Sequence, residues 1–417
     1  MHDRQHHQPE FDVTAAVNTQ EAAQPARRTF VLLALAAFAS SINLRVCDPL
    51  LPQIANGFSV SVGQAAAIIT AFAVGYGSLQ LFFGPVGDRF GKYRIAALAS
   101  LATGIVTALA AATSTLGQLT AIRFLAGACA AAPIPLAFAW IGDAVPFDKR
   151  QAVLARFLSA QISGIVLGQA AGGLLGEHLG WRAVFILVGA CHLTAGIAML
   201  LELKFHPEGQ PRSAIRRTGP GDVLAAVVGL LQRPWVRVML ISVFIEGFAF
   251  YGAFAYIGAD LHQRFDLSYA LIGVTMAVFG LGAITYALTA RRLLGLIGER
   301  GLALAGGAVL CVAYFCLALA PSAIAVAPIM VALGLGFYMI HNTLQTNATQ
   351  MAPESRGLGV SMFALALFIG QSVGVYLAAP AVDRWHAPAI YLVAAIVLPA
   401  IALWFRAMLA KRPAPGP

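Results

Sequence analysis

The residues most able to do chemistry are the few charged side chains that lie inside long apolar stretches. Glu246 stands about ten residues into the run 236–259, roughly 15 Å from its start if the run is helical. A carboxylate that far from water is costly to keep ionised. Glu246 is therefore a candidate to take up and release a proton, and the alternative role is a structural hydrogen bond to a neighbouring helix.

Three further charges lie within apolar runs. Arg45 and Asp48 are three residues apart, so they share one face of a helix, and Arg123 enters another run at a similar depth. Two arginines beside one carboxylate are predicted to form a cluster. The alternative for Asp48 is the start of a loop ahead of Pro49 and Pro52, where water reaches it.

A polar group ends the run 323–348. His341 is followed by Asn342 and Gln345, and a histidine at a helix end is either structural or a contact for a proton or substrate beside Glu246. Further polar and aromatic side chains within the runs are candidates to line a cavity: Gln80, Gln161, Gln371, Phe250, Tyr251 and Tyr256.

The elements that carry these residues follow from composition. Of 417 residues, 59% are apolar and 11% are charged, against about 25% charged in soluble domains. Mean hydropathy is +0.77. Uncharged runs follow one another from Phe30 to Leu409, which excludes a soluble enzyme, a secreted disulfide scaffold, a disordered protein and an alternating outer-membrane barrel. The sequence predicts an all-α polytopic membrane protein.

A spanning helix needs about 20 mostly apolar residues. That window predicts twelve transmembrane helices, at 29–51, 64–84, 95–112, 118–142, 152–175, 183–203, 236–259, 268–291, 301–320, 323–348, 357–380 and 388–409.

The distribution of Lys and Arg orients these spans. With both termini in the cytoplasm, only Arg182, Arg264 and Arg384 of the 27 cations lie outside, and Arg45 and Arg123 lie within spans. The predicted parts are a tail (1–28), a six-helix bundle (29–203), a cytoplasmic linker (204–235), a second six-helix bundle (236–409) and a tail (410–417).

One loop carries a specific resemblance. GPVGDRFGKYR (84–94), after the second span, resembles the signature loop of the major facilitator superfamily. In it, Gly84 and Gly91 are expected to allow close helix approach and a tight turn. Asp88 is expected to cap the next helix or to pair across the bundle, and Arg89 and Lys92 to sit at the anionic leaflet. The resemblance implies a conformational switch at this loop.

Other stretches resemble parts of the same family. Arg123 with Gly127 is similar to its intramembrane R-x-x-x-G element. GIVLGQAAGG (164–173) resembles the glycine-rich element of its proton-driven antiporters, with Gln169 where proline is usual. Small residues four apart let helices touch, so three of its glycines are predicted to pack against a neighbour: Gly164, Gly168 and Gly172.

The stretches RVCDPLLPQIA (45–55) and HNTLQTNATQMAPESRG (341–357) resemble bacterial arabinose-efflux-type and drug:proton antiporter permeases. The resemblance implies two bundles that rock about a central site in the bacterial inner membrane, exporting a small organic compound against protons. Proton-coupled uptake of a sugar, organic acid or metabolite is the first alternative, and a non-transporting membrane sensor is the second.

The sequence lacks the residues that several other functions require. The sequence has no phosphate-binding P-loop, no metal-ligand spacing and no nucleophile–base set, so we expect no cofactor, no bound metal and no enzymatic activity. The expected partners are a small-molecule substrate, protons and the bilayer, with no nucleic acid, for a chain acting as a monomer. Substrate charge stays open, because Glu246 favours a cation and the arginine pair favours an anion.

Overall fold

The computed structural model describes residues 13–206 and 220–411, and these residues form helices and no strands. The N-terminal half contains α1 (Val13–Arg45), α2 (Cys47–Phe58), α3 (Val62–Ala65), α4 (Ala67–Phe90), α5 (Lys92–Leu109), η1 (Ala110–Ala112), α6 (Leu116–Ala130), α7 (Pro133–Ala144) and α8 (Phe147–Phe205). The C-terminal half contains α9 (Pro220–Leu231), α10 (Pro234–Glu246), η3 (Gly247–Tyr251), α11 (Gly252–Phe254), α12 (Ile257–Phe265), α13 (Tyr269–Ala277), α14 (Phe279–Ala318), α15 (Ala323–Ala348), η4 (Pro353–Ser355), α16 (Arg356–Trp385) and α17 (Ala387–Ala410).

Within residues 13–206 and 220–411, ten helical stretches are long and apolar enough to cross a membrane, where the sequence predicts twelve. Two of them are unusually long: Lys149–Phe205 has 57 residues and Tyr269–Ala318 has 50. Each contains one glycine with non-helical backbone, Gly180 (φ 80°) and Gly298 (φ 64°). Turns this short leave the helical hydrogen bonding nearly continuous, so two predicted neighbours merge into one helix in each case.

The expected tails and linker lie partly outside the described residues, at 1–12, 207–219 and 412–417. Within the predicted linker the structure places a short apolar helix, α9, directly before α10. The residues 13–28 of the predicted N-terminal tail continue as helix into the first span. Polarity alone does not end a helix, because a helix that leaves the membrane can extend into water.

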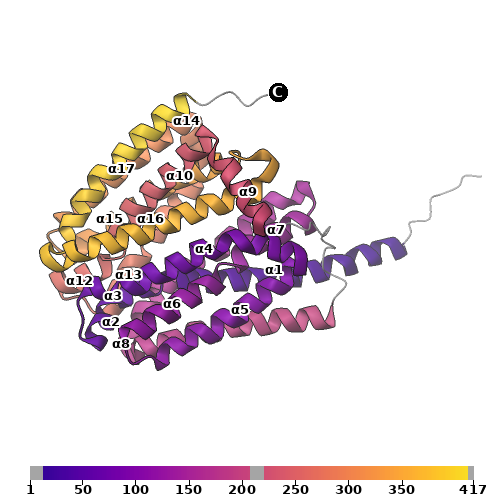
Figure 1. Ribbon diagram of the computed structural model, residues 1–417, viewed down its shortest axis with the longest axis horizontal. Coiled ribbons are helices and arrows are strands. Elements are labelled where there is room, and N and C mark those ends of the chain that lie inside the picture. Colours follow the sequence, from indigo (N-terminus) through magenta and orange to yellow (C-terminus); the bar gives the residue numbers. More distant parts are fainter. Residues whose placement is uncertain (1–12, 207–219, 412–417) are drawn as a thin grey trace, which may run out of the picture.

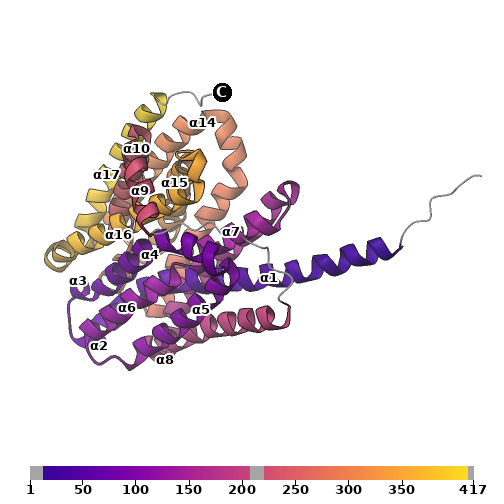
Figure 2. The ribbon, with the colours of Figure 1, turned by 45° about the vertical axis from the view of Figure 1, so that its right-hand side comes forward.

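The two halves of the chain form two helical layers that meet along α4 with α16 and α8 with α13 (Figures 1 and 2). Glycines permit this contact. A Cβ added at Gly273 of α13 would lie 2.6 Å from the carbonyl oxygen of Gln169 in α8, and one at Gly77 of α4 would lie 2.8 Å from Cβ of Phe368 in α16. Backbones therefore approach where the halves touch.

One end of the molecule, where α2 turns into α3 and α12 into α13, holds polar contacts between the halves. The carboxylate of Asp383 in α16 accepts hydrogen bonds from Ser61 Oγ (2.6 Å) and from the backbone N–H of Gly63 (2.9 Å). Nearby, the backbone N–H of Ala270 donates to Glu177 Oε2 (3.3 Å). The halves are thus joined at this end, and Figure 2 shows α14 leaning away from α8 toward the other end.

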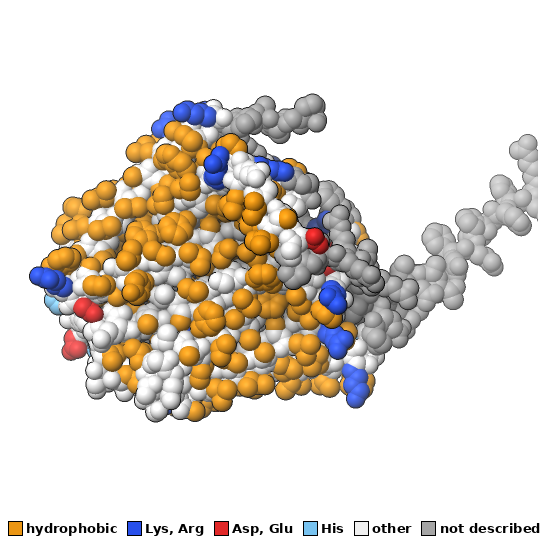
Figure 3. Space-filling model, in the orientation of Figure 1, with side chains coloured by type: hydrophobic (Ala, Val, Ile, Leu, Met, Phe, Trp, Pro, Cys, Tyr) orange, Lys and Arg blue, Asp and Glu red, His pale blue; other side chains and the backbone are white. Residues whose placement is uncertain are grey.

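The surface matches a bilayer. Figure 3 shows hydrophobic side chains across the face of both halves, with charged side chains gathered toward the edges. Several large apolar residues are mostly exposed, for example Leu288 (79%), Leu296 (80%) and Ile324 (86%). Exposed apolar area of this extent is stable only against lipid.

Candidate functional site

Glu246 ends α10 and is fully buried. Its Oε2 lies 3.0 Å from Nδ1 of His341 in α15, whose ring stacks on Phe337 with centroids 4.9 Å apart. The other carboxylate oxygen, Oε1, has no hydrogen-bond partner in the described structure. A carboxylate and an imidazole at this distance can share one proton, and the unpartnered oxygen leaves room for a second contact.

The helix departs from α geometry directly after Glu246. Residues Gly247–Tyr251 form a π-helical turn, a rare feature that occurs often at functional sites. Behind it, the ring of Phe250 packs 4.4 Å from that of Phe337 and is fully buried. Tyr256 is buried too, and its hydroxyl donates to the carbonyl of Val375 (2.7 Å). Phe250 and Tyr256, candidates for a cavity lining, are therefore core residues.

Tyr251, at the end of the π turn, meets a charge from the other half. The Cζ of Arg45, the last residue of α1, lies 3.9 Å from the centroid of the Tyr251 ring. Arg45 also pairs with Asp48, with 3.7 Å between Nη1 and Oδ2. A guanidinium on an aromatic face is held by cation–π attraction, so Arg45 connects the two halves next to the Glu246–His341 pair.

Asp48 lies inside α2 and is fully buried, so its interpretation as the start of a water-exposed loop is wrong. The Pro49 that follows fits in the first turn of a helix, where its missing N–H costs nothing. Neither oxygen of Asp48 makes a well-formed hydrogen bond among the described residues, so its charge is compensated by the Arg45 ion pair and by the more distant Arg123. A buried carboxylate held by one long ion pair is an expensive arrangement.

Arg123 is buried in α6 and bonds to Asn43 rather than to a carboxylate. Its Nη1 donates to Asn43 Oδ1 (2.6 Å) and its Nη2 to the Asn43 carbonyl (3.2 Å), while its Cζ lies 4.0 Å from the Phe72 ring centroid. The Asn43 amide in turn donates to Thr107 Oγ1 in α5 (2.8 Å). This network ties α1, α5 and α6 together, two residues before Arg45. Asn43 is missing from the sequence-based candidates, although an amide inside an apolar run is a detectable signal.

The remaining candidates in α15 lie apart from the pair. Asn342 is half-buried and Gln345 is exposed, and neither hydrogen-bonds to Glu246 or His341 in the described structure. A second buried ion pair escaped the sequence analysis: Asp260 and Arg264 in α12, 2.5 Å apart, with Arg264 also donating to carbonyls at the end of α14. It was missed because the last turn of α12 looks like an outer loop.

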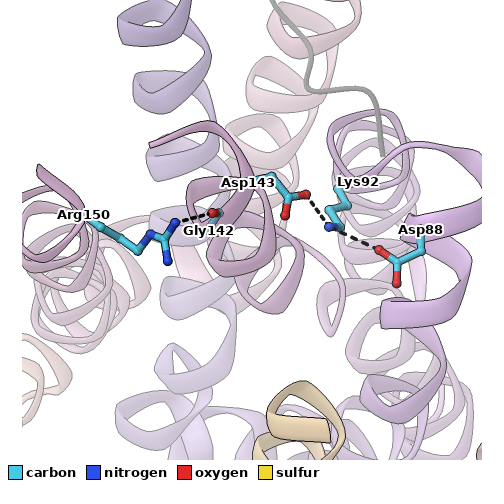
Figure 4. Close-up of polar contacts among 5 residues, drawn as sticks. All are labelled: Asp88, Lys92, Gly142, Asp143 and Arg150. Atoms are coloured by element: carbon cyan, nitrogen blue, oxygen red, sulfur yellow. Dashed lines mark hydrogen bonds and ion pairs between the residues drawn. The ribbon is translucent and has the colours of Figure 1, made fainter. Parts of the chain in front are cut away.

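The signature loop brings four helices together (Figure 4). Lys92, the first residue of α5, pairs with Asp88 of α4 at 3.2 Å and with Asp143 of α7. Arg150 of α8 donates to the carbonyl of Gly142 (2.6 Å). Gly91 has φ 96°, which only glycine adopts easily, so it makes the tight turn.

The structure distinguishes the two roles expected of Asp88 and corrects the expectation for Gly84. Asp88 does not cap α5, which has no side-chain cap, and its carboxylate forms an ion pair with Lys92. Gly84 makes no close approach, since a Cβ there would meet nothing within 4 Å. Arg89 is exposed, with its Cζ 5.0 Å from the Phe90 ring.

The glycines of α8 pack against the first span. A Cβ at Gly164 would lie 2.5 Å from the carbonyl oxygen of Phe38, one at Gly168 would lie 2.9 Å from Cα of Ile42, and one at Gly172 would lie 2.9 Å from the carbonyl oxygen of Val46. These distances are shorter than real Cβ contacts, so the spacing of four residues lets α8 touch α1 along its length.

Comparison with known proteins identifies the family. The sequence profile described as Major Facilitator Superfamily matches residues 33–375. The chain belongs to this superfamily. It is therefore a multi-pass membrane transporter and not an enzyme, as its resemblance to the family predicts.

Two relatives of the chain are resistance proteins. A chloramphenicol resistance protein of Streptomyces lividans is 29% identical over 361 residues, 84% of this chain and 87% of its own. A bicyclomycin resistance protein homolog of Haemophilus influenzae is 25% identical over 236 residues, 56% and 58% of the two chains. The crystal structure of the nucleoside transporter NupG has a TM-score of 0.74 at 11% identity, covering 92% of this chain and 100% of that one, which shows a shared fold.

Proposed function

We propose that this protein exports a small organic compound in exchange for protons, by alternating access of a site between its halves. The observation that carries the proposal is the buried Glu246–His341 pair, 3.0 Å apart, next to the Arg45–Tyr251 contact that joins the halves. The resistance proteins among its relatives support export as the direction. Chloramphenicol and bicyclomycin appear in the names of those relatives, and neither compound is assigned to this protein.

The proposed architecture has twelve spans. Ten candidates become twelve if the two long helices each cross twice, turning at Gly180 and Gly298. Bundles at 29–203 and 236–409, a linker at 204–235 and tails at 1–28 and 410–417 complete it. With both termini in the cytoplasm of a bacterium, most Lys and Arg lie on the cytoplasmic side of the inner membrane, and the end sealed by Asp383 faces outward. The chain is proposed to act as a monomer.

In the proposed cycle, a proton from outside binds at the Glu246–His341 pair and neutralises the carboxylate. Loss of that charge changes the field at Tyr251 and Arg45, so Arg45 is held less firmly against the C-terminal half. Substrate leaves outward, the halves rock inward, and the proton is released to the cytoplasm. Coupling requires that proton and substrate bias the two conformations differently, and Asp48 contributes by pairing with Arg45 in one of them.

The other candidates position these groups. The Arg123–Asn43 bonds fix the end of α1 and therefore the place of Arg45 and Asp48. On α15, Asn342 and Gln345 are proposed substrate contacts.

At the cytoplasmic end, the loop residues Gly84, Asp88, Arg89, Gly91 and Lys92 are proposed as the conformational switch, with Lys92 bracing α4, α5 and α7.

The test is substrate-driven proton movement in liposomes containing the purified protein. The panel holds chloramphenicol, an organic cation, a sugar, an organic acid and a nucleoside, and each is measured with the parent and with Glu246→Gln. The exposed carboxylate of Glu299 provides the matched control, Glu299→Gln. Export predicts proton flux opposite to substrate flux, lost in Glu246→Gln and kept in the control.

Other outcomes contradict the proposal in distinct ways. Proton and substrate moving in the same direction indicate uptake. Substrate flux without proton movement, unchanged in Glu246→Gln, indicates a facilitator in which Glu246 is structural. No flux of any panel member, with normal folding, favours the membrane sensor.

A further inference from the structure

A hollow of about 470 Å³ lies on the surface of the protein, between the segment of α14 around and after Gly298 and the C-terminal end of α17. Two arginines line it, Arg300 from α14 and Arg406 from α17, above an apolar wall that includes Ile297, Leu304 and Leu403. In Figure 1 the middle of α14, where its label stands, lies beside the C-terminal end of α17, away from the sealed end. The hollow is therefore separate from the Glu246–His341 pair.

The charges of this hollow are not compensated by the residues that line it. None of its lining residues is a carboxylate, and the acidic residue beside it is Glu299, which lines an adjoining hollow that shares Arg300. Arg406 has no hydrogen-bond or ion-pair partner within residues 13–206 and 220–411, and Arg300 makes one hydrogen bond, from Nη2 to the carbonyl of Leu409 (3.3 Å). A comparable hollow beside the first span carries Arg27 and Arg28 together with Glu202, so its charge is partly balanced. The hollow at α14 and α17 thus has two arginines and no carboxylate in its own lining, an arrangement that favours an anion.

Shape and surroundings favour a lipid as the occupant. The lining also includes the small residues Gly301, Ala407 and Ala410, which occupy little of the space between the two helices. Leu403 is 53% exposed and Ile297 is 43% exposed, so the wall below the arginines faces the acyl chains of the bilayer. A phosphodiester can accept paired hydrogen bonds from guanidinium groups, while its chains cover the apolar wall.

We propose that this hollow binds an anionic phospholipid, with the headgroup phosphate held between Arg300 and Arg406 and the acyl chains along Leu304 and Leu403. Such a lipid fastens the end of α17 to α14, because each arginine belongs to a different helix. A general attraction of cations to an anionic leaflet would need no hollow and no particular pair of residues. A specific site and a general attraction therefore predict different results when the two arginines of the hollow, or two other arginines of the surface, are replaced.

The experiment measures lipid binding to the detergent-purified protein by native mass spectrometry, titrating phosphatidylglycerol and phosphatidylcholine with the same acyl chains. The variant is Arg300→Gln with Arg406→Gln. The control is Arg291→Gln with Arg292→Gln, two exposed arginines of the same half that do not line this hollow. We expect affinity for phosphatidylglycerol to fall about fivefold per arginine, about 25-fold for the pair, and less than about twofold in the control.

A steric variant keeps the charges and fills the space. Ala407→Phe should reduce phosphatidylglycerol binding about tenfold or more with both arginines present, and Ala410→Leu repeats the test if the first variant does not fold. Equal losses in the two arginine pairs, or no loss in the filled variants, would overturn the proposal in favour of general surface charge. Displacement of the lipid by millimolar glycerol phosphate would overturn it too, because the site would then bind soluble phosphate.

Discussion

Removing the charge of Asp383 should open the sealed end of the protein more often. In the structure this carboxylate of α16 accepts hydrogen bonds from Ser61 Oγ (2.6 Å) and Gly63 N–H (2.9 Å), at the start of the helical segment that leads into α4. A carboxylate there also gains from the partial positive charge of a helix N-terminus. Any conformation that opens this end must break both bonds, so Asp383→Asn weakens the closed state selectively.

The expected size of the shift between the closed and open states follows from the solvent exposure of Asp383. Hydrogen bonds to a charged group contribute about 1.5–3 kcal/mol each when buried. Asp383 is exposed, where charged contacts are worth about 0.2–1 kcal/mol. We therefore expect about 1–2 kcal/mol for the two bonds together, which shifts the equilibrium between closed and open states about 5- to 30-fold.

A buried reporter measures that shift. Ser372 of α16 is 3% exposed, and its Oγ donates to the carbonyl of Thr70 in α4 (3.3 Å), so a cysteine there reacts only when the halves separate. In a background without the five native cysteines, Ser372→Cys is treated from outside with a membrane-impermeant thiol reagent. The rate should rise about 5- to 30-fold with Asp383→Asn.

The matched control is Asp266→Asn, an exposed carboxylate at the same end with no bond to the other half. Asparagine tolerates the left-handed backbone of that position (φ 50°). If Asp383→Asn changes the rate no more than Asp266→Asn, the carboxylate does not hold the end closed. In that case apolar packing of α4 on α16 alone seals it.

Two further predictions concern packing and the buried arginine. Gly164→Ala should lower the thermal midpoint of the purified protein, at a cost of about 1–3 kcal/mol, because the added Cβ would collide with a backbone carbonyl oxygen 2.5 Å away. The control is Gly84→Ala, which should leave the midpoint unchanged because its Cβ would meet nothing within 4 Å. Arg123→Lys should lose the paired geometry at Asn43, and a double-mutant cycle with Asn43→Ala should give about 1–3 kcal/mol of coupling. The cycle isolates the bond to the Asn43 side chain, because alanine keeps the backbone carbonyl, and a value near zero would show that this side-chain bond does not matter.

Local patterns predicted much of the fold because they depend on distances along one helix. The apolar runs gave the spans, and three-residue spacing put Arg45 and Asp48 on one face. The glycines at 164, 168 and 172 indicated a contact face, and the structure supplies α1 as its partner. The turns at Gly180 and Gly298 fall where short loops were expected, but they leave the helices merged.

What the sequence did not predict depends on register between helices far apart in the chain. Arg123 was expected in a cluster with Arg45 and Asp48, and its charge does act on Asp48, but its hydrogen bonds go to Asn43 of α1. The contact of Asp383 with Ser61 joins residues 322 positions apart, and each looks like an ordinary loop residue on its own. Pairings of this kind follow from how whole helices pack, which no short window of sequence contains.

The π turn at Gly247–Tyr251 means that its span does not follow one helical phase from end to end. A π turn accommodates about one residue more than an α turn, and one residue corresponds to about 100° of rotation. The side chains before the turn, including Glu246, are therefore rotated by about 100° about the helix axis from where an uninterrupted α-helix would place them. In an uninterrupted α-helix, Glu246 and Tyr251 are five residues apart and would point about 140° away from each other. The inserted residue reduces this angle to about 40°, so the carboxylate that contacts α15 and the ring that contacts Arg45 lie toward the same side of the span.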